Sequence, residues 1–210
     1  MKPDDPIVFV VDDDHRMREA LSSLVEAMGF RVATFGLASE FLGADKPDSP
    51  ACLILDLELP DINGLELQQE LADREAPPVI IVTGHGDIPS SVRAMKAGAV
   101  EFLTKPFDEQ QLQTAIEKAI AMDQSARQRR SEVTHLKNRY DLLTPREREI
   151  LPYVVAGFLN KQTAADLGTS EITIRVHRGQ IMRKMGARSL AELVRMADKL
   201  GITLRSGPIG

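Results

Sequence analysis

Short apolar runs alternate with stretches of helical periodicity through the first half of the chain. Such runs are typical of strands buried on both faces of a parallel sheet, and the stretches between them repeat apolar residues at helical spacing. This alternation predicts a doubly wound α/β domain with right-handed crossovers. The expected strands are residues 7–12, 30–35, a run ending at 56, 78–82 and 100–103, and the expected helices are 14–29, one through 41–42, 65–74 and 87–98.

Carboxylates follow two of the expected strands. Asp12, Asp13 and Asp14 come directly after the first apolar run, and Asp56 ends the run through Leu55. Because parallel strands end at one edge of a sheet, these acids are expected to converge where open α/β sheets bind ligands. Asp56 alone is explained equally well as the cap of the following turn. The carboxylates of the whole cluster would repel one another, and such clusters usually hold a hard cation. The cluster therefore predicts a Mg²⁺ or Mn²⁺ site.

A hydroxyl and an ammonium are expected at the same edge. Thr83 follows the fourth strand, and Lys105 follows the fifth. With the acids, they suit a phosphoryl group on Asp56, because Mg²⁺ bridges carboxylate and phosphoryl oxygens while Thr and Lys bind the remaining oxygens. His85, two residues after Thr83, is expected near this site.

Residues 107–144 contain neither glycine nor proline, although the chain has 14 Gly and 12 Pro. Leu112, Ile116 and Ala119 keep helical spacing, which Leu136 resumes further on. The pattern predicts a long helix from about residue 108 that continues into a linker. Breaks near 127–131 remain open, and the alternative is a flexible charged linker.

Helix-capping signals then predict four short helices that form a compact bundle containing a helix-turn-helix. Thr144 and Glu147 form a capping box around Pro145, and a second box begins at Ser189. The expected helices are residues 145–156, 161–167 capped by Asn160, 171–185 capped by Ser170, and one from 189 to 200.

Charge divides the chain into two halves. The formal net charge of −5 is the sum of −12 over residues 1–122 and +7 over residues 123–210. This asymmetry indicates two domains with different partners, and the basic half is the candidate for nucleic acid. The helix 171–185 carries Arg175, His177, Arg178, Gln180, Arg183 and Lys184, and its packing face is expected to be Ile172, Ile174, Val176, Ile181 and Met185.

The composition excludes several other classes of protein. No apolar run is long enough to span a bilayer, and the N-terminus has no charged and then apolar leader. We therefore expect a cytoplasmic protein without membrane contact. One cysteine, Cys52, cannot form an internal disulfide, and the four histidines show no zinc-binding spacing.

Residues 1–122 resemble the receiver domain of response regulators, which has a (βα)5 flavodoxin-like fold. The paired acids, the central Asp, the Thr and the Lys-Pro pair carry this resemblance by their order. It implies that Asp56 is the phosphoacceptor, that the Lys105–Pro106 bond is cis, and that Phe102 is an aromatic switch residue. The implied metal ligands are Asp12, Asp13, Asp56 and the backbone carbonyl of Glu58, and Thr83 and Lys105 would bind phosphoryl oxygens.

Residues 142–205 resemble the LuxR-type helix-turn-helix domain of the FixJ/NarL family, with 123–141 as the linker. Residues 143–147, Asn160-Lys161 and 173–177 carry the resemblance, and the run 84–87 is similar to the FixJ-like subgroup. The resemblance implies base-edge contacts by Arg175, Val176 and Gly179, and phosphate contacts by Thr173, Arg178 and Lys184. Lys161 is a further candidate for a phosphate contact, and the alternative is that it is simply solvated. Gly179 departs from relatives that have a long side chain there.

The two resemblances together imply a transcription factor activated by phosphorylation of Asp56 from a sensor histidine kinase. The active form would be a homodimer that binds double-stranded promoter DNA and acts with RNA polymerase. The receiver pocket would assist only its own phosphorylation and dephosphorylation, so the protein is not expected to be an enzyme. One alternative is an aspartyl-phosphate hydrolase, although Glu58 stands where haloacid-dehalogenase-type phosphatases have a second Asp. The other alternative is a DNA-binding regulator whose receiver does not switch.

Overall fold

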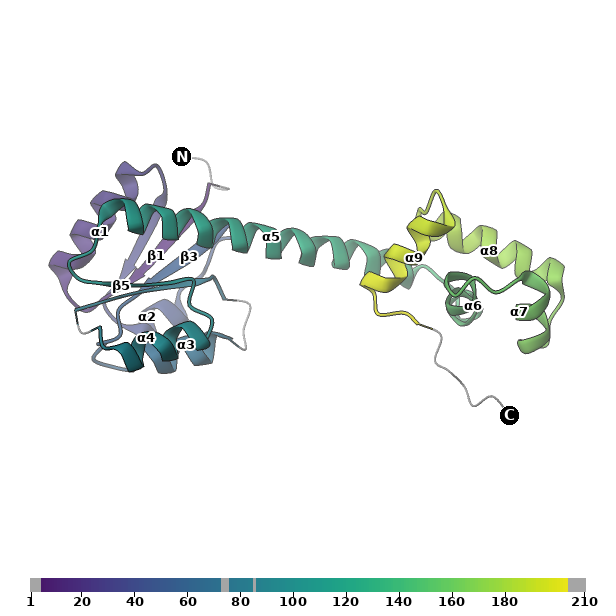
Figure 1. Ribbon diagram of the computed structural model, residues 1–210. Helices are drawn as coiled ribbons and strands as arrows, with labels where there is room; N and C mark the ends of the chain where they lie inside the picture. The colour runs from purple at the N-terminus through teal and green to yellow at the C-terminus, as the bar shows by residue number, and fades with distance from the viewer. Residues whose placement is uncertain (1–4, 73–75, 85, 204–210) are drawn as a thin grey trace. The chain divides into compact units, whose positions relative to one another are not determined.

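The computed structural model describes residues 5–72, 76–84 and 86–203. The chain divides into two compact units, Met1–Arg127 and Gln128–Gly210. Figure 1 shows a parallel sheet with helices in the first unit and helices alone in the second. His85, which was expected near the phosphorylation site, lies outside the described residues.

Five parallel strands form the sheet of the first unit, in the order β2-β1-β3-β4-β5. Strands β1, β3 and β4 are buried at every position, as their uninterrupted apolar sequences indicate. Val11 pairs with Leu55, so the residues that follow β1 and β3 start at the same edge. The strands are β1 (Ile7–Val11), β2 (Arg31–Phe35), β3 (Ala51–Leu55), β4 (Val79–Thr83) and β5 (Glu101–Thr104).

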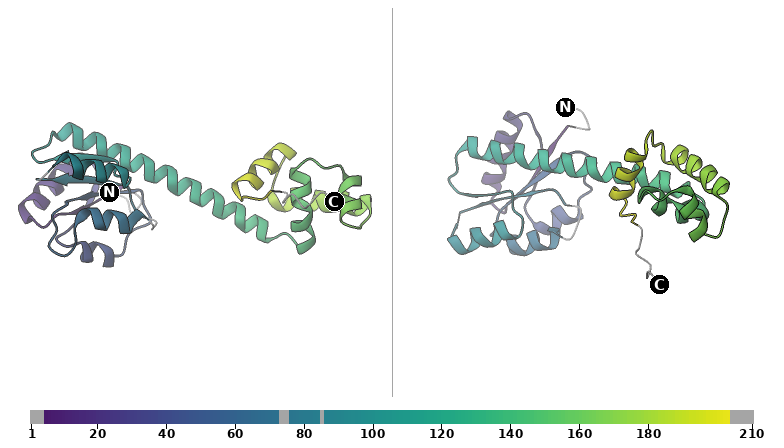
Figure 2. Two further views of the ribbon diagram at one scale, coloured as in Figure 1. Left: turned by 60° about the horizontal axis from the view of Figure 1, so that its bottom comes forward. Right: turned by 45° about the vertical axis from the view of Figure 1, so that its right-hand side comes forward.

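Helices cover both faces of this sheet, which confirms the doubly wound fold. Alternate strand residues supply two cores: Val8 and Val10 pack with Leu21 and Ile116, whereas Phe9 and its neighbours on the other face pack in a second cluster. Figure 1 and the views in Figure 2 show α1 and α5 over one face and α2, α3 and α4 over the other. The helices are α1 (His15–Ala27), α2 (Ala38–Gly43), α3 (Gly64–Ala72), α4 (Ile88–Lys96) and α5 (Glu109–Asp141).

The start of α2 is capped from a distant part of the chain. Leu37 occupies the cap position and has no side-chain hydrogen bond to the helix. The carboxylate of Asp61 instead accepts hydrogen bonds from the N–H groups of Ala38 and Ser39, at 3.2 and 2.9 Å. The loop that follows Asp56 therefore supplies the cap of α2. By contrast, α4 takes its cap from the residue directly before it, because the Asp87 side chain accepts a hydrogen bond from Ser90 N.

Helix α5 is continuous over 33 residues, which confirms the long helix expected from residue 108 onward. Within the first unit, the buried carboxylate of Asp123 holds this helix to the start of β3. It accepts hydrogen bonds from Ala51 N at 2.9 Å and from Arg127 Nε at 2.7 Å. No helix in the described parts of the chain has the length and apolar content for a membrane crossing.

The second unit is a helical bundle whose core includes Ile150, Ile174, Ile181, Met185 and Leu193. The capping box of Thr144 and Glu147 is confirmed, as is the cap at Ser170. Ser189 caps α9, but the expected box there is incomplete, because the Glu192 carboxylate accepts from Arg188 N and not from Ser189 N. Besides the end of α5, the bundle contains α6 (Pro145–Val155), α7 (Asn160–Asp166), α8 (Glu171–Met185) and α9 (Leu190–Lys199).

Two details of the expected bundle were wrong. Asn160 is the first residue of α7 and not its cap, and the preceding Leu159 N–H donates to Gln162 Oε1 at 2.9 Å. Ile172 and Val176 were expected in the packing face of α8, but both are exposed, because they lie on the side of the helix away from Ile174 and Ile181. An exposed Val176 agrees with its expected place at a base edge.

Candidate functional site

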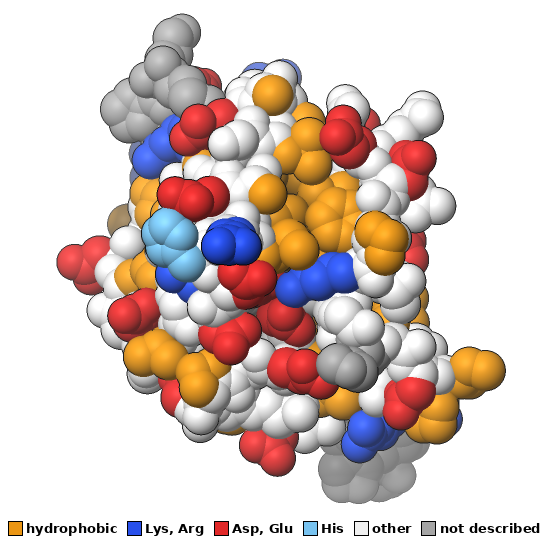
Figure 3. Space-filling view, turned by 90° about the vertical axis from the view of Figure 1, so that its left-hand side faces the viewer, with side chains coloured by type: hydrophobic (Ala, Val, Ile, Leu, Met, Phe, Trp, Pro, Cys, Tyr) orange, Lys and Arg blue, Asp and Glu red, His pale blue; other side chains and the backbone are white. Residues whose placement is uncertain are grey.

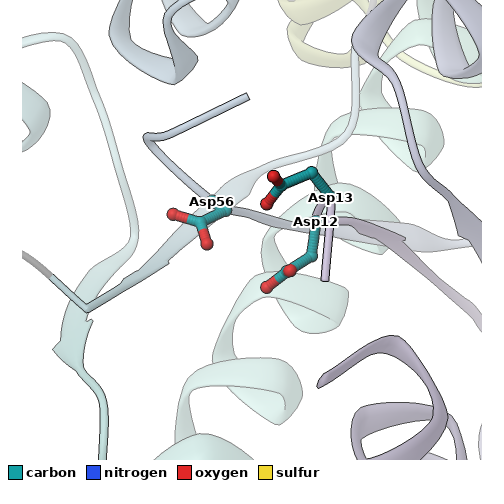
Figure 4. A group of neighbouring side chains, drawn as sticks. All are labelled: Asp12, Asp13 and Asp56. Carbon is teal, nitrogen blue, oxygen red and sulfur yellow. The ribbon is translucent and has the colours of Figure 1, made fainter. Parts of the chain in front are cut away.

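Three carboxylates gather where β1 and β3 end. Oxygens of Asp12, Asp13 and Asp56 all lie within 4.8 Å of one another, and Figure 4 draws the three side chains as one group. Asp12 is 2% exposed and Asp56 6% exposed, whereas Asp13 is open to solvent. The parallel register of the two strands thus brings together acids that are more than forty positions apart in the sequence, as expected.

Lys105 joins two of these acids. Its Nζ donates to Asp12 Oδ2 at 2.7 Å and to Asp56 Oδ2 at 2.6 Å. Burial raises the pKa of Asp12 above its ordinary value, and the hydrogen bond from Lys105 opposes this effect without cancelling it. Burial lowers the pKa of Lys105, but its bonds to Asp12 and Asp56 outweigh burial and leave that pKa raised. The raised pKa of Lys105 fits a site with more negative than positive charge, whereas the raised pKa of Asp12 is due chiefly to burial.

The donors of this site fit a divalent cation. Three carboxylates and one ammonium leave a formal charge of about −2 when all are ionised. Carboxylate oxygens are the ligands that Mg²⁺ and Mn²⁺ prefer. Figure 3 shows acidic side chains gathered on the face where the strands end, with basic side chains among them. The cluster is therefore compatible with divalent-metal binding.

The loop after Asp56 lies close against it. The N–H of Glu58 donates to Asp56 Oδ1 at 3.2 Å, so the Glu58 backbone borders the cluster. Gly64 at the end of this loop leaves no room for a side chain, because a Cβ there would lie 2.3 Å from the Asp56 carbonyl oxygen. Nothing in the local sequence marks Gly64 as a packing requirement, because a glycine in a turn is ordinary.

Thr83 and Phe102 lie on the neighbouring strands β4 and β5. Thr83 is fully buried, and its carbonyl accepts a hydrogen bond from Lys105 N at 2.8 Å. Phe102 is half-buried, and its ring lies beside Gly86, where a Cβ would be 3.3 Å from Phe102 Cε1. The Lys105–Pro106 bond is cis, as the resemblance implies.

The residues expected at base edges share the exposed side of α8. The Arg175 side chain is 72% exposed, and its Nη2 lies 3.8 Å from Glu171 Oε1. Val176 and Gly179 are exposed as well, and so is Lys161 on α7. Thr173 belongs to the first turn of α8, where its hydroxyl oxygen lies 2.8 Å from that of Ser170.

Two residues expected at phosphates have partners inside the bundle. Arg178 Nη1 donates to the Phe158 carbonyl at 3.0 Å. Lys184 Nζ lies 2.6 Å from Oε2 of the buried Glu147. Both cations therefore hold α8 against its neighbours in the bundle. The number of basic residues on α8 does not indicate which of them have such partners.

Arg18 on α1 also contacts the backbone of the acid cluster. Its guanidinium donates to the backbone carbonyls of Asp12 and Asp13, at 2.7 and 2.9 Å. No sequence pattern marks such a contact, because a basic residue near the start of an exposed helix is ordinarily solvated.

Known proteins match both units. Residues 8–117 match the response regulator receiver domain, and residues 141–197 match the luxR family of bacterial regulatory proteins. Nodulation protein W of Bradyrhizobium diazoefficiens is 48% identical over 198 residues, which cover 94% of this chain and 87% of that protein. The transcriptional regulatory protein FixJ of the same organism is 40% identical over 196 residues, covering 93% and 96%.

Solved structures agree with these matches. The low-resolution structure of the response regulator StyR has a TM-score of 0.82 and 46% identity, covering 93% of this chain and 99% of that one. Full-length FixJ from B. japonicum has a TM-score of 0.53 and 38% identity, covering 93% and 97%. This chain therefore belongs to the response regulators that join a receiver domain to a LuxR-type DNA-binding domain.

Proposed function

We propose that Asp56 is the phosphoacceptor through which this transcription regulator is switched. The observation that carries the proposal is the bridge from Lys105 to both Asp12 and Asp56 beside the exposed carboxylate of Asp13. An acid at this edge with one ammonium and two further carboxylates has the groups that a phosphoryl transfer needs. A sensor kinase is the partner that a receiver domain implies.

The residues around Asp56 have separate roles in this transfer. An Asp56 carboxylate oxygen attacks the phosphorus of the donor, the bond from phosphorus to the leaving group breaks, and the leaving group keeps the electron pair. Lys105 and Thr83 would hold phosphoryl oxygens. Asp12, Asp13, Asp56 and the Glu58 carbonyl would hold Mg²⁺, which neutralises charge on the phosphoryl oxygens when bound. The pocket would serve only its own phosphorylation and dephosphorylation.

We also propose that phosphorylation produces a homodimer through α4 and β5. Thr83 would move toward the phosphoryl group and Phe102 would turn inward, so that the surface of these two elements changes. The exposed side chains of Ile88, Val92 and Met95 on α4 support this assignment, because they give the helix an apolar face. Light scattering at micromolar protein should show a doubled mass after phosphorylation, and an unchanged mass would contradict the dimer.

On DNA, α8 would enter the major groove, with Arg175, Val176 and Gly179 toward base edges. Phosphates would be contacted by Lys161, Thr173 and Arg178. Arg178 would use a nitrogen other than Nη1, or would give up the hydrogen bond from Nη1 to the Phe158 carbonyl. Lys184 was also expected at a phosphate, but we assign it to the pair with Glu147 instead, because that carboxylate already compensates its charge. A dimer would present two such helices to an inverted repeat in cytoplasmic promoter DNA and act there with RNA polymerase.

Affinity for specific DNA, measured with and without acetyl phosphate and Mg²⁺, tests the proposed switch. Wild-type protein should bind more tightly after phosphorylation, and Asp56→Asn should show no change with the phosphodonor. A non-switching receiver predicts equal affinities for the treated and untreated wild-type protein. An aspartyl-phosphate hydrolase predicts continued release of phosphate from the donor with no gain in DNA affinity.

A further inference from the structure

We propose that Arg18 is a positioning residue of the cation site, which holds the backbone of Asp12 and Asp13 so that both carboxylates face the metal. One nitrogen of its guanidinium, Nη1, donates to the Asp12 carbonyl at 2.7 Å and to the Asp13 carbonyl at 2.9 Å. Two hydrogens on a single atom thus tie together two consecutive peptide groups. The inference rests on the proposed function, because the metal concerned is the Mg²⁺ of the phosphorylation site.

The surroundings of the guanidinium keep it in this place. Gly36, in the turn after β2, lies beside it, because a Cβ at Gly36 would be in ordinary van der Waals contact with Arg18 Nη1, at 3.5 Å. The same turn is tied to the acid loop by the hydrogen bond from Asp12 N to the Phe35 carbonyl, at 3.2 Å. The guanidinium therefore lies between the end of β1, which it binds, and the turn after β2, which it contacts.

Two features of the position of Arg18 disfavour a cation. It is the fourth residue of α1, close to the positive end of the helix dipole. Its charge would also repel a metal bound by the neighbouring acids. Before a metal binds, the negative charge of the three carboxylates offsets both effects. The two hydrogen bonds to the backbone, and not the charge, are therefore what a metal-bound site gains from Arg18.

Two effects of Arg18 on a bound cation are opposed in sign, and this makes the proposal testable. Its charge weakens cation binding, but solvent and salt screen the charge of a partly exposed guanidinium. Its hydrogen bonds orient the peptide groups that carry the metal ligands, and the loss of such supporting contacts typically lowers metal affinity by about 10-fold or more. If orientation dominates, removal of Arg18 weakens metal binding, whereas a pure charge effect would strengthen it.

The test is a titration of the full-length protein with Mn²⁺, followed by electron paramagnetic resonance of the free ion. Arg18→Ala should bind Mn²⁺ about 10-fold more weakly than wild type. Arg16→Ala is the matched control, because Arg16 is an exposed cation two positions earlier on the same helix. The control should bind as tightly as wild type or slightly more tightly, since it loses only a charge.

A second measurement separates orientation of the ligands from general damage. The Mg²⁺ concentration for half-maximal phosphorylation by acetyl phosphate should rise by the same factor in Arg18→Ala. The rate at saturating Mg²⁺ should stay near that of wild type, because Asp56 and Lys105 are unchanged. Arg18→Lys keeps a charge and a donor on a shorter side chain, so its affinity for the metal should lie between those of wild type and Arg18→Ala. If Arg18→Ala does not fold, Arg18→Lys is compared with wild type in its place.

The outcomes distinguish this inference from the function on which it rests. If wild-type protein bound no Mn²⁺, the proposed metal site itself would fail. If wild type bound Mn²⁺ and Arg18→Ala bound it equally or more tightly, only the role of Arg18 would be overturned. A lower rate at saturating Mg²⁺ with an unchanged half-maximal concentration would also overturn that role.

Discussion

Lys184 on α8 and Glu147 on α6 form an ion pair of 2.6 Å whose carboxylate is 4% exposed. The same Glu147 oxygen, Oε2, accepts a hydrogen bond from Thr144 N at 2.8 Å, as part of the capping box. The N-terminal cap of α6 is thus joined to the last turn of α8. This pairing gives Lys184 a structural role and leads to two predictions.

Lys184→Ala should lower the free energy of unfolding of the second unit by about 1–3 kcal/mol, because a buried carboxylate loses its cation. Tyrosine fluorescence reports on this unit alone, since the chain has no Trp and both tyrosines, Tyr140 and Tyr153, belong to it. The salt dependence of DNA binding should stay unchanged in Lys184→Ala. Lys161→Ala should instead flatten the slope of log affinity against log salt concentration by about one unit. An equal flattening in Lys184→Ala would show that Lys184 does contact a phosphate.

Glu147 should make stability depend on pH in the acid range. Burial raises its pKa, but the bonds from Lys184 and Thr144 outweigh burial and hold the pKa below its ordinary value. The contribution is therefore fully present above the unfolded value of about 4.3 and is lost as the pH falls through the folded value. Urea unfolding at pH 7 and pH 3 should show this loss in wild type and a smaller one in Glu147→Gln. Glu149→Gln, at a half-exposed neighbour, should behave as wild type does.

Gly64→Ala should destabilise the first unit by about 1–3 kcal/mol and slow its phosphorylation. The added methyl group would lie 2.3 Å from the Asp56 carbonyl oxygen and 2.8 Å from Leu57 Cα, and both are backbone atoms that cannot turn away. Gly43→Ala is the control, because a Cβ at Gly43 meets no atom within 4 Å. Calorimetry and labelling by acetyl phosphate measure the two effects. Equal stability and labelling of the two variants would show that the loop moves to accommodate the methyl group without disturbing Asp56.

Arg175→Ala should weaken binding to specific DNA by about 1–3 kcal/mol, because a guanidinium can donate two hydrogen bonds to guanine. Its side chain is free to do so, with only a long contact to Glu171. Binding to a scrambled duplex should be nearly unaffected. Arg183→Ala removes a charge from the same helix at a position whose Nη2 donates to Gln180, and it should affect both duplexes alike. An equal loss on both duplexes in Arg175→Ala would place this residue among the phosphate contacts.

Local patterns determined most of the fold. The buried strands, the long α5 and the caps at Asp87, Thr144 and Ser170 follow from the spacing of apolar residues and from short-range cap chemistry. The meeting of Asp12 with Asp56 was also predictable, because parallel strands end at one edge and both acids follow strands.

Tertiary structure alone decided which partner each polar side chain takes. Asp61 caps α2 rather than its own turn, Arg18 holds the carbonyls of Asp12 and Asp13, and Lys184 pairs with Glu147 instead of remaining exposed. A periodicity places a residue on a face of its helix or strand, but it contains no information about what the next element presents to that face. The partners are 23 and 37 positions apart for Asp61 with Ala38 and for Lys184 with Glu147, so only the packing of whole elements brings them within hydrogen-bond distance.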